Sequence, residues 1–360
     1  MRGKRRNSPE LPDASAGTPE ERRERARQDF TFFRRAYFPH YCLVGGDSRL
    51  HEWLDTELPR MADEPEGVRL AIAAPRGEAK STFVSLFFVL WAVLTGRKHY
   101  ILIIADALEQ AASLLGAVKD ELEFNEALKR DFPGAGKGHV WNVGTVVTPG
   151  NVKIQALGAG KRMRGLRHGP HRPDLIVLDD LENDGNVDKP EQRDKLQSWL
   201  QKTVLNLGAA DGSMDVVYVG TLLHYDSVLA RTLRKPLWKA RTFRSILRWP
   251  DRMDLWDEWE SLLSSRGEAE ARRFYRQHRA KMEAGAEVSW PASRPLYRLM
   301  CLRAEDREAF DSEQQNDPLS TNEAPFNGCI TFWVDRSRDW LLFGAVDPSL
   351  GKQGAGRDPS

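Results

Sequence analysis

The stretch "AAPRGEAKST" (residues 73–82) resembles a phosphate-binding loop in which the usual glycines are replaced. The usual pattern is G-x-x-x-x-G-K-[ST]; here Ala74 and Ala79 occupy the glycine positions, followed by Lys80 and Ser81. The apolar run at 68–74 predicts a buried strand before the loop, and residues 80–96 predict a helix after it. Backbone N–H groups and the helix dipole favour an anion between two such elements. The stretch therefore predicts a nucleotide site.

Within this loop, each residue type suits one part of a nucleotide. Lys80 would reach the β- and γ-phosphates, and the Ser81 hydroxyl would be a ligand of Mg²⁺. Arg76 adds a forked cation suited to phosphate oxygens. The predicted ATP-binding residues are Arg76, Gly77, Glu78, Ala79, Lys80, Ser81 and Thr82. The alternative is that the Lys-Ser pair only begins a helix.

The rest of the chain predicts an α/β fold. Apolar runs at 99–106, 174–181 and 214–223 alternate with helical stretches at 107–132 and 189–206, and residues 146–158 predict a hairpin. Near-continuous apolar strands separated by helices indicate a mainly parallel sheet flanked by helices on both faces. A charged, Trp-rich helical segment at 254–285 and further helix at 295–318 follow.

A second motif, "LIVLDD", ends one of the apolar strands in two carboxylates. Asp179 would hold the metal through water, and Asp180 would orient or deprotonate an attacking water. Arg164 and Arg167, on the loop before this strand, would stabilise the transition-state charge in cis or on a neighbouring subunit. Alternatively, the carboxylates cap a helix, and the arginines contact DNA phosphates or form surface ion pairs.

Composition indicates an ordinary soluble protein. The 360 residues are 41% hydrophobic and 29% charged, and no apolar run approaches the ~18 residues that cross a bilayer. The N-terminus lacks the apolar core of a signal peptide, and Cys42, Cys301 and Cys329 form no disulfide framework, which predicts a cytoplasmic location and no membrane partner. The net charge is +1, but basic residues gather at 2–6, 161–168 and 230–244. Each of these runs is either solvated surface or a set of contacts to phosphates.

Taken together, the motifs resemble those of the large terminase subunit of tailed bacteriophages. The family's loop is commonly a degenerate [AG]-P-R-G-x-[AGS]-K-[ST], which "APRGEAKST" satisfies, and its "RG…RPDLIVLDD" layout matches "MRGLRHGPHRPDLIVLDD". Its coupling motif matches "VVYVGT", with Gly220 and Thr221. "GAVDPSLG" is similar to the first strand of its nuclease. The resemblance covers about residues 30–360.

This resemblance implies a P-loop NTPase of the additional-strand type that uses ATP and Mg²⁺ to translocate double-stranded viral DNA into a procapsid. Asp180 falls where the family has its catalytic acid, with Glu182 as the fallback in "DDLE", and Thr221 would report loss of the γ-phosphate. Arg76 and Arg164 would be the arginine sensors or finger. The implied partners are duplex DNA, the portal protein, the small terminase subunit and further copies of the chain in a ring.

The implied organisation has four parts: a flexible basic arm at 1–28, an ATPase domain at 29–250, a helical lid or linker at 251–335, and the start of an RNase H-like nuclease at 336–360. Such a nuclease needs several carboxylates around two Mg²⁺ or Mn²⁺ ions. The sequence supplies Asp347, the first of them, with Asp358 as a second candidate, so we expect an ATP hydrolase without endonuclease activity, from a truncated copy or a prophage.

Two other functions fit parts of the same sequence. A helicase-like ATPase would share the P-loop but would continue into a second motor lobe with its own arginine finger. A truncated prophage remnant would only bind a portal or small-terminase partner, without catalysis. ATP turnover with and without duplex DNA distinguishes these possibilities.

Overall fold

The predicted mainly parallel sheet is present in the computed structural model of the chain, which describes residues 17–42 and 45–318. Eight strands run in the order β3-β4-β5-β2-β6-β7-β1-β8, and the six from β5 to β8 are parallel. Their bounds are β1 Arg69–Ala73, β2 Tyr100–Ala105, β3 Val140–Trp141, β4 Thr145–Val147, β5 Lys153–Gly158, β6 Leu175–Asp179, β7 Asp215–Gly220 and β8 Lys239–Thr242. The loop at residues 74–82, which we call the P-loop after the motif that it resembles, follows β1, and β1 lies between β7 and β8.

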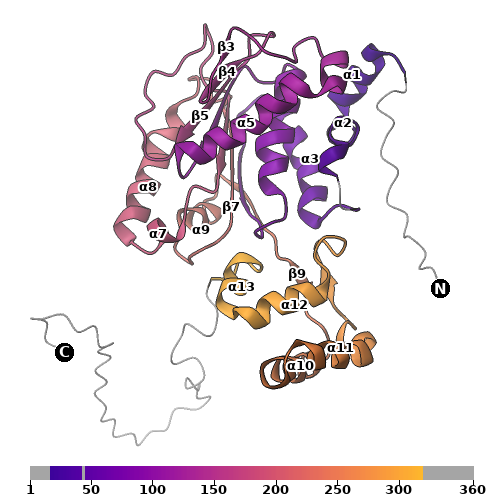
Figure 1. The fold of residues 1–360 in the computed structure, drawn as a ribbon. Helices are drawn as coiled ribbons and strands as arrows, with labels where there is room; N and C mark the ends of the chain where they lie inside the picture. The colour runs from indigo at the N-terminus through magenta and orange to yellow at the C-terminus, as the bar shows by residue number, and fades with distance from the viewer. Residues whose placement is uncertain (1–16, 43–44, 319–360) are drawn as a thin grey trace, which may run out of the picture. The chain divides into compact units, whose positions relative to one another are not determined.

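Helices cover both faces of this sheet (Figure 1). One face carries α1 (Pro19–Gln28), α2 (Phe30–Tyr37), α3 (Arg49–Asp63), η2 (Thr82–Phe88), α4 (Val89–Leu94), α5 (Leu108–Phe124) and α6 (Glu126–Asp131). The short helix η1 (Pro39–Tyr41) follows α2. The other face carries α8 (Pro190–Lys202), η3 (Val204–Asn206) and α9 (Val228–Leu233), with α7 (Asp184–Val187) leading into α8.

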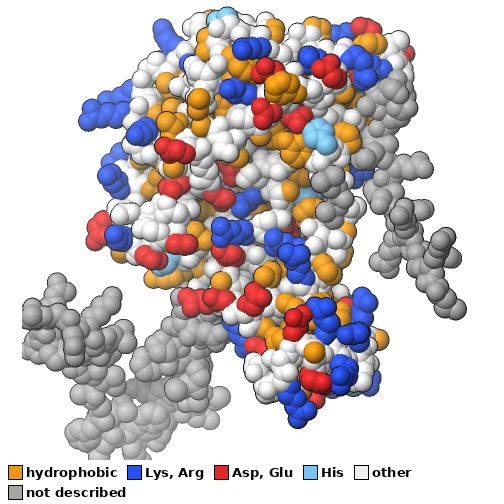
Figure 2. Space-filling view, in the orientation of Figure 1, with side chains coloured by type: hydrophobic (Ala, Val, Ile, Leu, Met, Phe, Trp, Pro, Cys, Tyr) orange, Lys and Arg blue, Asp and Glu red, His pale blue; other side chains and the backbone are white. Residues whose placement is uncertain are grey.

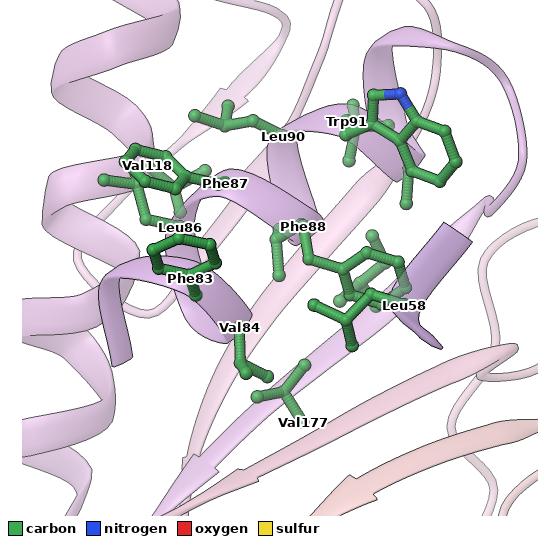
Figure 3. Close-up of a cluster of buried hydrophobic side chains, with 14 of the residues drawn as sticks. Leu58, Phe83, Val84, Leu86, Phe87, Phe88, Leu90, Trp91, Val118 and Val177 are labelled. Atoms are coloured by element: carbon green, nitrogen blue, oxygen red, sulfur yellow. The ribbon is translucent and has the colours of Figure 1, made fainter. Parts of the chain in front are cut away.

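Two apolar cores form because side chains alternate between the faces of a strand. In β2, Ile101 and Ile103 pack into the larger core, whereas Leu102 and Ile104 pack into the smaller core on the opposite face. All four side chains are fully buried, as expected of a parallel strand covered on both sides. Figure 3 shows the centre of the larger core, where Phe83, Phe87 and their neighbours from η2 and α4 lie beside the sheet.

The helix after the P-loop differs from the prediction in its hydrogen bonding. Residues 80–96 were expected to form one ordinary helix, but Thr82–Phe88 form a π-helix that continues into α4. Aromatic and β-branched residues dominate "TFVSLFF", and their helix propensity is low. Their burial against the sheet keeps the segment helical, and wide π-turns of this kind often occur beside functional sites.

A third apolar core lies within the helical stretch that follows the sheet. It contains α10 (Met253–Arg266), α11 (Glu268–Met282), α12 (Leu296–Glu305), α13 (Arg307–Glu313) and the small antiparallel pair β9 (Ile246–Arg248) and β10 (Glu287–Val288). Trp256 and Trp259, in the stretch predicted as a Trp-rich helical segment, lie on α10 and are buried in this core. The described residues all belong to one compact unit.

The α/β class, the hairpin and the long strands agree with the sequence prediction, whereas β8 and β3 were not predicted. β8 was missed because its sequence "KART" is polar and fully exposed, so it lacks the apolar pattern of the other strands. The domain boundaries at 28, 250 and 335 stay predictions, and the basic run at 2–6, the nuclease-like strand and Asp347 lie outside the described residues. Across the part of the chain that the structure describes, no helix is long and apolar enough to span a membrane.

Candidate functional site

The P-loop carries its two tight turns at Gly77 and Ala79. Gly77 has φ +78°, and Ala79 has φ +56°, a left-handed conformation that is unusual for a residue with a Cβ. Ala79 therefore adopts at the second position the backbone that glycine supplies in the usual motif. The amide of Phe83 donates to the carbonyl of Ala79 over 3.0 Å, so the helical hydrogen bonding begins at the loop. Alanine in place of the second glycine therefore keeps the left-handed turn at this position, at the cost of backbone strain.

Lys80 lies at the centre of the site. Its side chain is 7% exposed, and its Nζ is 3.2 Å from Asp180 Oδ2 and 3.2 Å from Thr221 Oγ1. The Thr221 hydroxyl also donates to the carbonyl of Ala74 over 3.2 Å. One ammonium group thus joins the P-loop to the ends of β6 and β7, where the sequence predicted a catalytic acid and a coupling residue.

Asp179 ends β6 facing the first turn of the P-loop helix. Its two carboxylate oxygens accept hydrogen bonds from Ser81 Oγ at 3.0 Å and Ser85 Oγ at 2.6 Å. Burial, and secondly the charge of Asp180, raise the pKa of Asp179 to about 6, although Ser85, Lys80 and Ser81 oppose the shift. A hydroxyl and a carboxylate side by side are oxygen donors of the kind that Mg²⁺ prefers, so the donor set fits the predicted metal.

Asp180 follows in a strained backbone conformation, with φ +44°. Its amide donates to the carbonyl of Val219 over 3.0 Å, and its carbonyl accepts from the amide of Asp106 over 3.3 Å. A Cβ added to Gly220 would lie 3.2 Å from Leu229 Cδ2 and 3.4 Å from Asp180 Oδ1, so the end of β7 lies close to the Asp180 carboxylate. Left-handed non-glycine residues concentrate at functional sites, where the surrounding structure holds the strain.

Glu182, the fallback for the catalytic acid, is held at the start of α9. Its Oε1 accepts from the amide of Val228 at 2.6 Å, and its Oε2 accepts from the amide of Leu229 at 3.0 Å and from the hydroxyl of Tyr218 at 3.1 Å. Burial raises the pKa of Glu182, although these hydrogen bonds oppose the shift. Both oxygens are engaged, which gives Glu182 a helix-capping contact. Its role in activating water stays a prediction.

The apex of the P-loop contacts the helical segment 289–316. The guanidinium of Arg76 pairs with Glu313 at 2.5 Å, and the Arg76 amide donates to the Glu313 carbonyl over 2.8 Å. The guanidinium of Arg294 packs so closely on Gly77 that an added Cβ would lie 1.8 Å from it. Glu78 is buried, and its Oε2 accepts a 3.3 Å hydrogen bond from Ser289. Thr82 begins η2. Of the predicted loop residues, Arg76 and Lys80 line the pocket described next, and the ATP-binding role of the set stays a prediction.

A pocket of about 200 Å³ lies between these groups. Arg76, Lys80, Asp180, Glu182 and Thr221, all predicted from the sequence, line it. Six further lining residues were not predicted: Asp106, Gln110, Asn183, Asp184, Leu223 and Glu313. Asp106 ends the apolar strand "ILIIAD" as Asp179 ends "LIVLD", so the same signal could have indicated it, whereas nothing local distinguishes Gln110 or Glu313. No cluster of three or more metal-ligating His, Cys, Asp or Glu occurs among the described residues.

The two predicted catalytic arginines are separate from this pocket. Arg164 and Arg167 are exposed on the connection from β5 to β6 and do not line it. Arg167 precedes His168, whose Nε2 lies 2.9 Å from the carbonyl of Asn151, before the start of β5. β1 and β5 are parallel strands of one sheet. Asn151 lies before the start of β5, whereas the P-loop follows the end of β1, so the two are at opposite ends of the strands. In this structure Arg167 therefore lies away from its own chain's Lys80.

No protein-family model matches the chain, and no curated protein matches it. Among solved structures, it is similar to the large terminase ATPase domain of Thermus phage P74-26, with a TM-score of 0.36 and 14% identity over 73% of this chain and 92% of that chain. An arginine-to-alanine mutant of the same phage domain gives a TM-score of 0.32, with 14% identity over 71% of this chain and 90% of the other.

Proposed function

We propose that this chain is an ATP hydrolase of the large terminase type, which uses ATP to translocate double-stranded DNA. The observation that supports it best is the placement of Lys80 Nζ, 3.2 Å from both Asp180 and Thr221 at the exit of a P-loop. In the structure this buried ammonium is paired with the Asp180 carboxylate, and the phosphates of a nucleoside triphosphate would take over that role next to the lysine. The terminase type comes from the joint resemblance of the loop, "LIVLDD" and "YVGT" motifs.

In this proposal, the P-loop residues from Arg76 to Thr82 bind the phosphates, through their backbone amides and the Lys80 ammonium. Ser81 Oγ and the Asp179 carboxylate, 3.0 Å apart, would hold Mg²⁺, Asp179 through a water. The ion would neutralise charge on the phosphate oxygens. Ser85 holds the second oxygen of Asp179, which fixes the orientation of the carboxylate.

Of the two carboxylates Asp179 and Asp180, Asp180 is the one that we propose to orient or deprotonate the attacking water. In the structure its carboxylate faces Lys80, and a triphosphate that engages Lys80 would release it to orient a water. Its left-handed backbone places it directly after β6, where its side chain lines the pocket and is 32% exposed. Glu182 is the alternative, but it would have to give up its contacts with α9.

The DNA and assembly partners belong to the same proposal. Duplex DNA, the portal protein, a small terminase subunit and a homo-oligomeric ring on the procapsid follow from the family resemblance, in the cytoplasm of a bacterial host. On the face drawn in Figure 2, basic and acidic side chains are interspersed over the sheet domain, in line with the net charge of +1. We therefore expect DNA binding to depend on a local set of arginines and lysines rather than on overall charge.

ATP turnover of the full chain with Mg²⁺, with and without duplex DNA, tests the proposal. We expect hydrolysis that DNA stimulates, and we expect Lys80→Ala to reduce it to background because the phosphates lose their main cation. Lys202→Ala, an exposed lysine at the end of α8, is the matched control and should hydrolyse ATP like the wild type.

Three results would count against the proposal. Absence of turnover in the folded wild type, or turnover that Lys80→Ala leaves unchanged, would exclude the ATPase function. Turnover that duplex DNA does not stimulate would leave a P-loop ATPase but remove the DNA-translocating function.

A further inference from the structure

The side chain of Asn316 joins three parts of the chain near the nucleotide pocket. Its Oδ1 accepts from the amide of Leu222 at 2.9 Å, and its Nδ2 donates to the carbonyl of Phe243 at 2.8 Å. Leu222 follows β7, and Phe243 follows β8. Asn316 itself follows α13, is 5% exposed and has φ +50°. One buried amide therefore fastens the ends of two strands to the end of a helix.

The Leu222 end of this joint leads directly to the nucleotide site. Leu222 is bonded to Thr221, whose hydroxyl is 3.2 Å from Lys80 Nζ and 3.2 Å from the carbonyl of Ala74. Because the peptide unit between Thr221 and Leu222 is planar and rigid, fixing the Leu222 amide restricts the position of Thr221. Asn316 is thus connected to the P-loop lysine through two residues, Leu222 and Thr221, and two hydrogen bonds.

The helix before Asn316 contacts the same site from its other side. The carbonyl of Glu313, the last residue of α13, accepts from the amide of Arg76 over 2.8 Å. The carbonyl of Gln314 accepts from the amide of Ser245 over 2.8 Å. Residues 313–316 therefore contact both the P-loop and the end of β7, and Asn316 provides the side-chain link to β7.

We propose that Asn316 is a positioning residue for ATP turnover, which holds Thr221 at the nucleotide site and couples it to α13. The proposal rests on the ATPase function proposed above. A buried amide that satisfies one donor and one acceptor at fixed distances restricts both partners, and its loss leaves both unpaired. Asparagine is also one of the few side chains that tolerates the left-handed backbone required here.

Two substitutions separate the hydrogen bonds from the backbone strain. Asn316→Ala removes the amide and keeps a Cβ at the left-handed position, whereas Asn316→Gly removes the amide and relieves the strain. We expect both to lower kcat about ten-fold while the KM for ATP changes less than about three-fold, because the phosphate-binding loop is intact and only Thr221 is released.

The chain offers a matched control in Asn125. Its Oδ1 accepts from the amides of Ala127 and Leu128, both at 3.1 Å, and its Nδ2 donates to the carbonyl of Tyr37 at 2.8 Å. This amide also joins separate segments, but it does not line the nucleotide pocket. Asn125→Ala should lose stability like Asn316→Ala, with unchanged turnover per folded molecule.

A double-mutant cycle tests whether Asn316 acts through Thr221. If it does, Thr221→Ala combined with Asn316→Gly should be no slower than Thr221→Ala alone, because the second substitution removes a constraint that no longer has a target. Independent effects would multiply instead. Multiplying effects, or wild-type kcat in Asn316→Gly, would overturn the proposal while a loss of activity in Lys80→Ala still supported the ATPase function.

Hydrogen exchange provides a readout that does not need turnover. On addition of ATP and Mg²⁺, the wild type should change its exchange both at Leu222 and in residues 307–313, and Asn316→Gly should lose the change in 307–313. A wild-type response confined to the P-loop would contradict the coupling. A chain that binds no nucleotide at all would refute both this inference and the proposed function.

Discussion

At the scale of single residues, the departures from the usual P-loop motif have structural explanations. Gly77 has φ +78°, a conformation that favours glycine, and the Arg294 guanidinium lies where its Cβ would be, whereas Ala79 adopts a left-handed conformation with its Cβ present. The sequence predicted a strand, a loop and a helix here from local signals, and the structure has that order, whereas phosphate binding by the loop stays a prediction. It could not predict Arg294 or Glu313, because they come from a distant segment whose position depends on the packing of the third core.

The conformation of Ala79 makes a prediction about stability. Ala79→Gly should raise the free energy of unfolding by about 1 kcal/mol, because glycine adopts φ +56° without the steric cost of a Cβ. Ala280→Gly, at an exposed position in α11, should lower it by about 1 kcal/mol. Urea unfolding of the two variants measures both effects. A loss of stability in Ala79→Gly would show that the left-handed turn is not strained in solution.

At the scale of elements, a buried ion pair holds the N-terminal helices to the rest of the sheet domain. Asp131, at the end of α6, pairs with Arg22 of α1 at 2.5 Å and accepts from the hydroxyl of Tyr37 at 2.9 Å. Burial tends to raise the pKa of Asp131, but the hydrogen bonds from Arg22 and Arg130 outweigh it and hold the pKa well below its usual range. Residues 17–28, predicted as the end of a flexible arm, are thereby packed into the fold.

This joint predicts an acid-sensitive contribution to stability. Because the folded-state pKa of Asp131 is lowered, its contribution is full above the unfolded pKa of about 4 and is lost as the pH falls through the folded value. Asp131→Asn should therefore be less stable than the wild type at pH 7, with a gap that narrows below about pH 4. Thermal unfolding across this range measures it. Glu126→Gln, in an exposed pair with Lys129, should show no such gap, and equal curves for Asp131→Asn and wild type would contradict the prediction.

The sequence predicted elements well where burial on both faces produces continuous apolar runs, as in β2 and β6. It failed where an element is defined only by its partner. β8 is an edge strand of exposed residues that pairs with β1 alone, and the π-helical form of η2 results from packing rather than from local propensity. The carboxylates of the site could be recognised in the sequence because they come at the ends of apolar strands. Gln110 lies within α5, where no local pattern marks it as a pocket residue.

At the scale of the whole molecule, the pocket is lined by two cationic side chains of the P-loop, Arg76 and Lys80. The β5–β6 connection, which was predicted to supply an arginine, contributes none to it. Arg164 is exposed and does not line the pocket of its own chain, so the proposed charge stabilisation needs either a movement of its loop or the arginine of a second copy, and we predict the second. Such a contribution requires assembly, and it makes hydrolysis depend on the concentration of the chain.

Mixing of inactive variants tests this arrangement. Arg164→Ala should abolish hydrolysis and leave ATP affinity near the wild-type value, because the missing group acts on the transition state of a neighbour. Lys80→Ala cannot turn over its own nucleotide but still presents Arg164, so a mixture of the two should recover part of the wild-type rate. Arg172→Ala, exposed on the same loop, should remain active and serves as the control. A mixture that stays inactive would place Arg164 in cis, after a movement of its loop, or outside catalysis altogether.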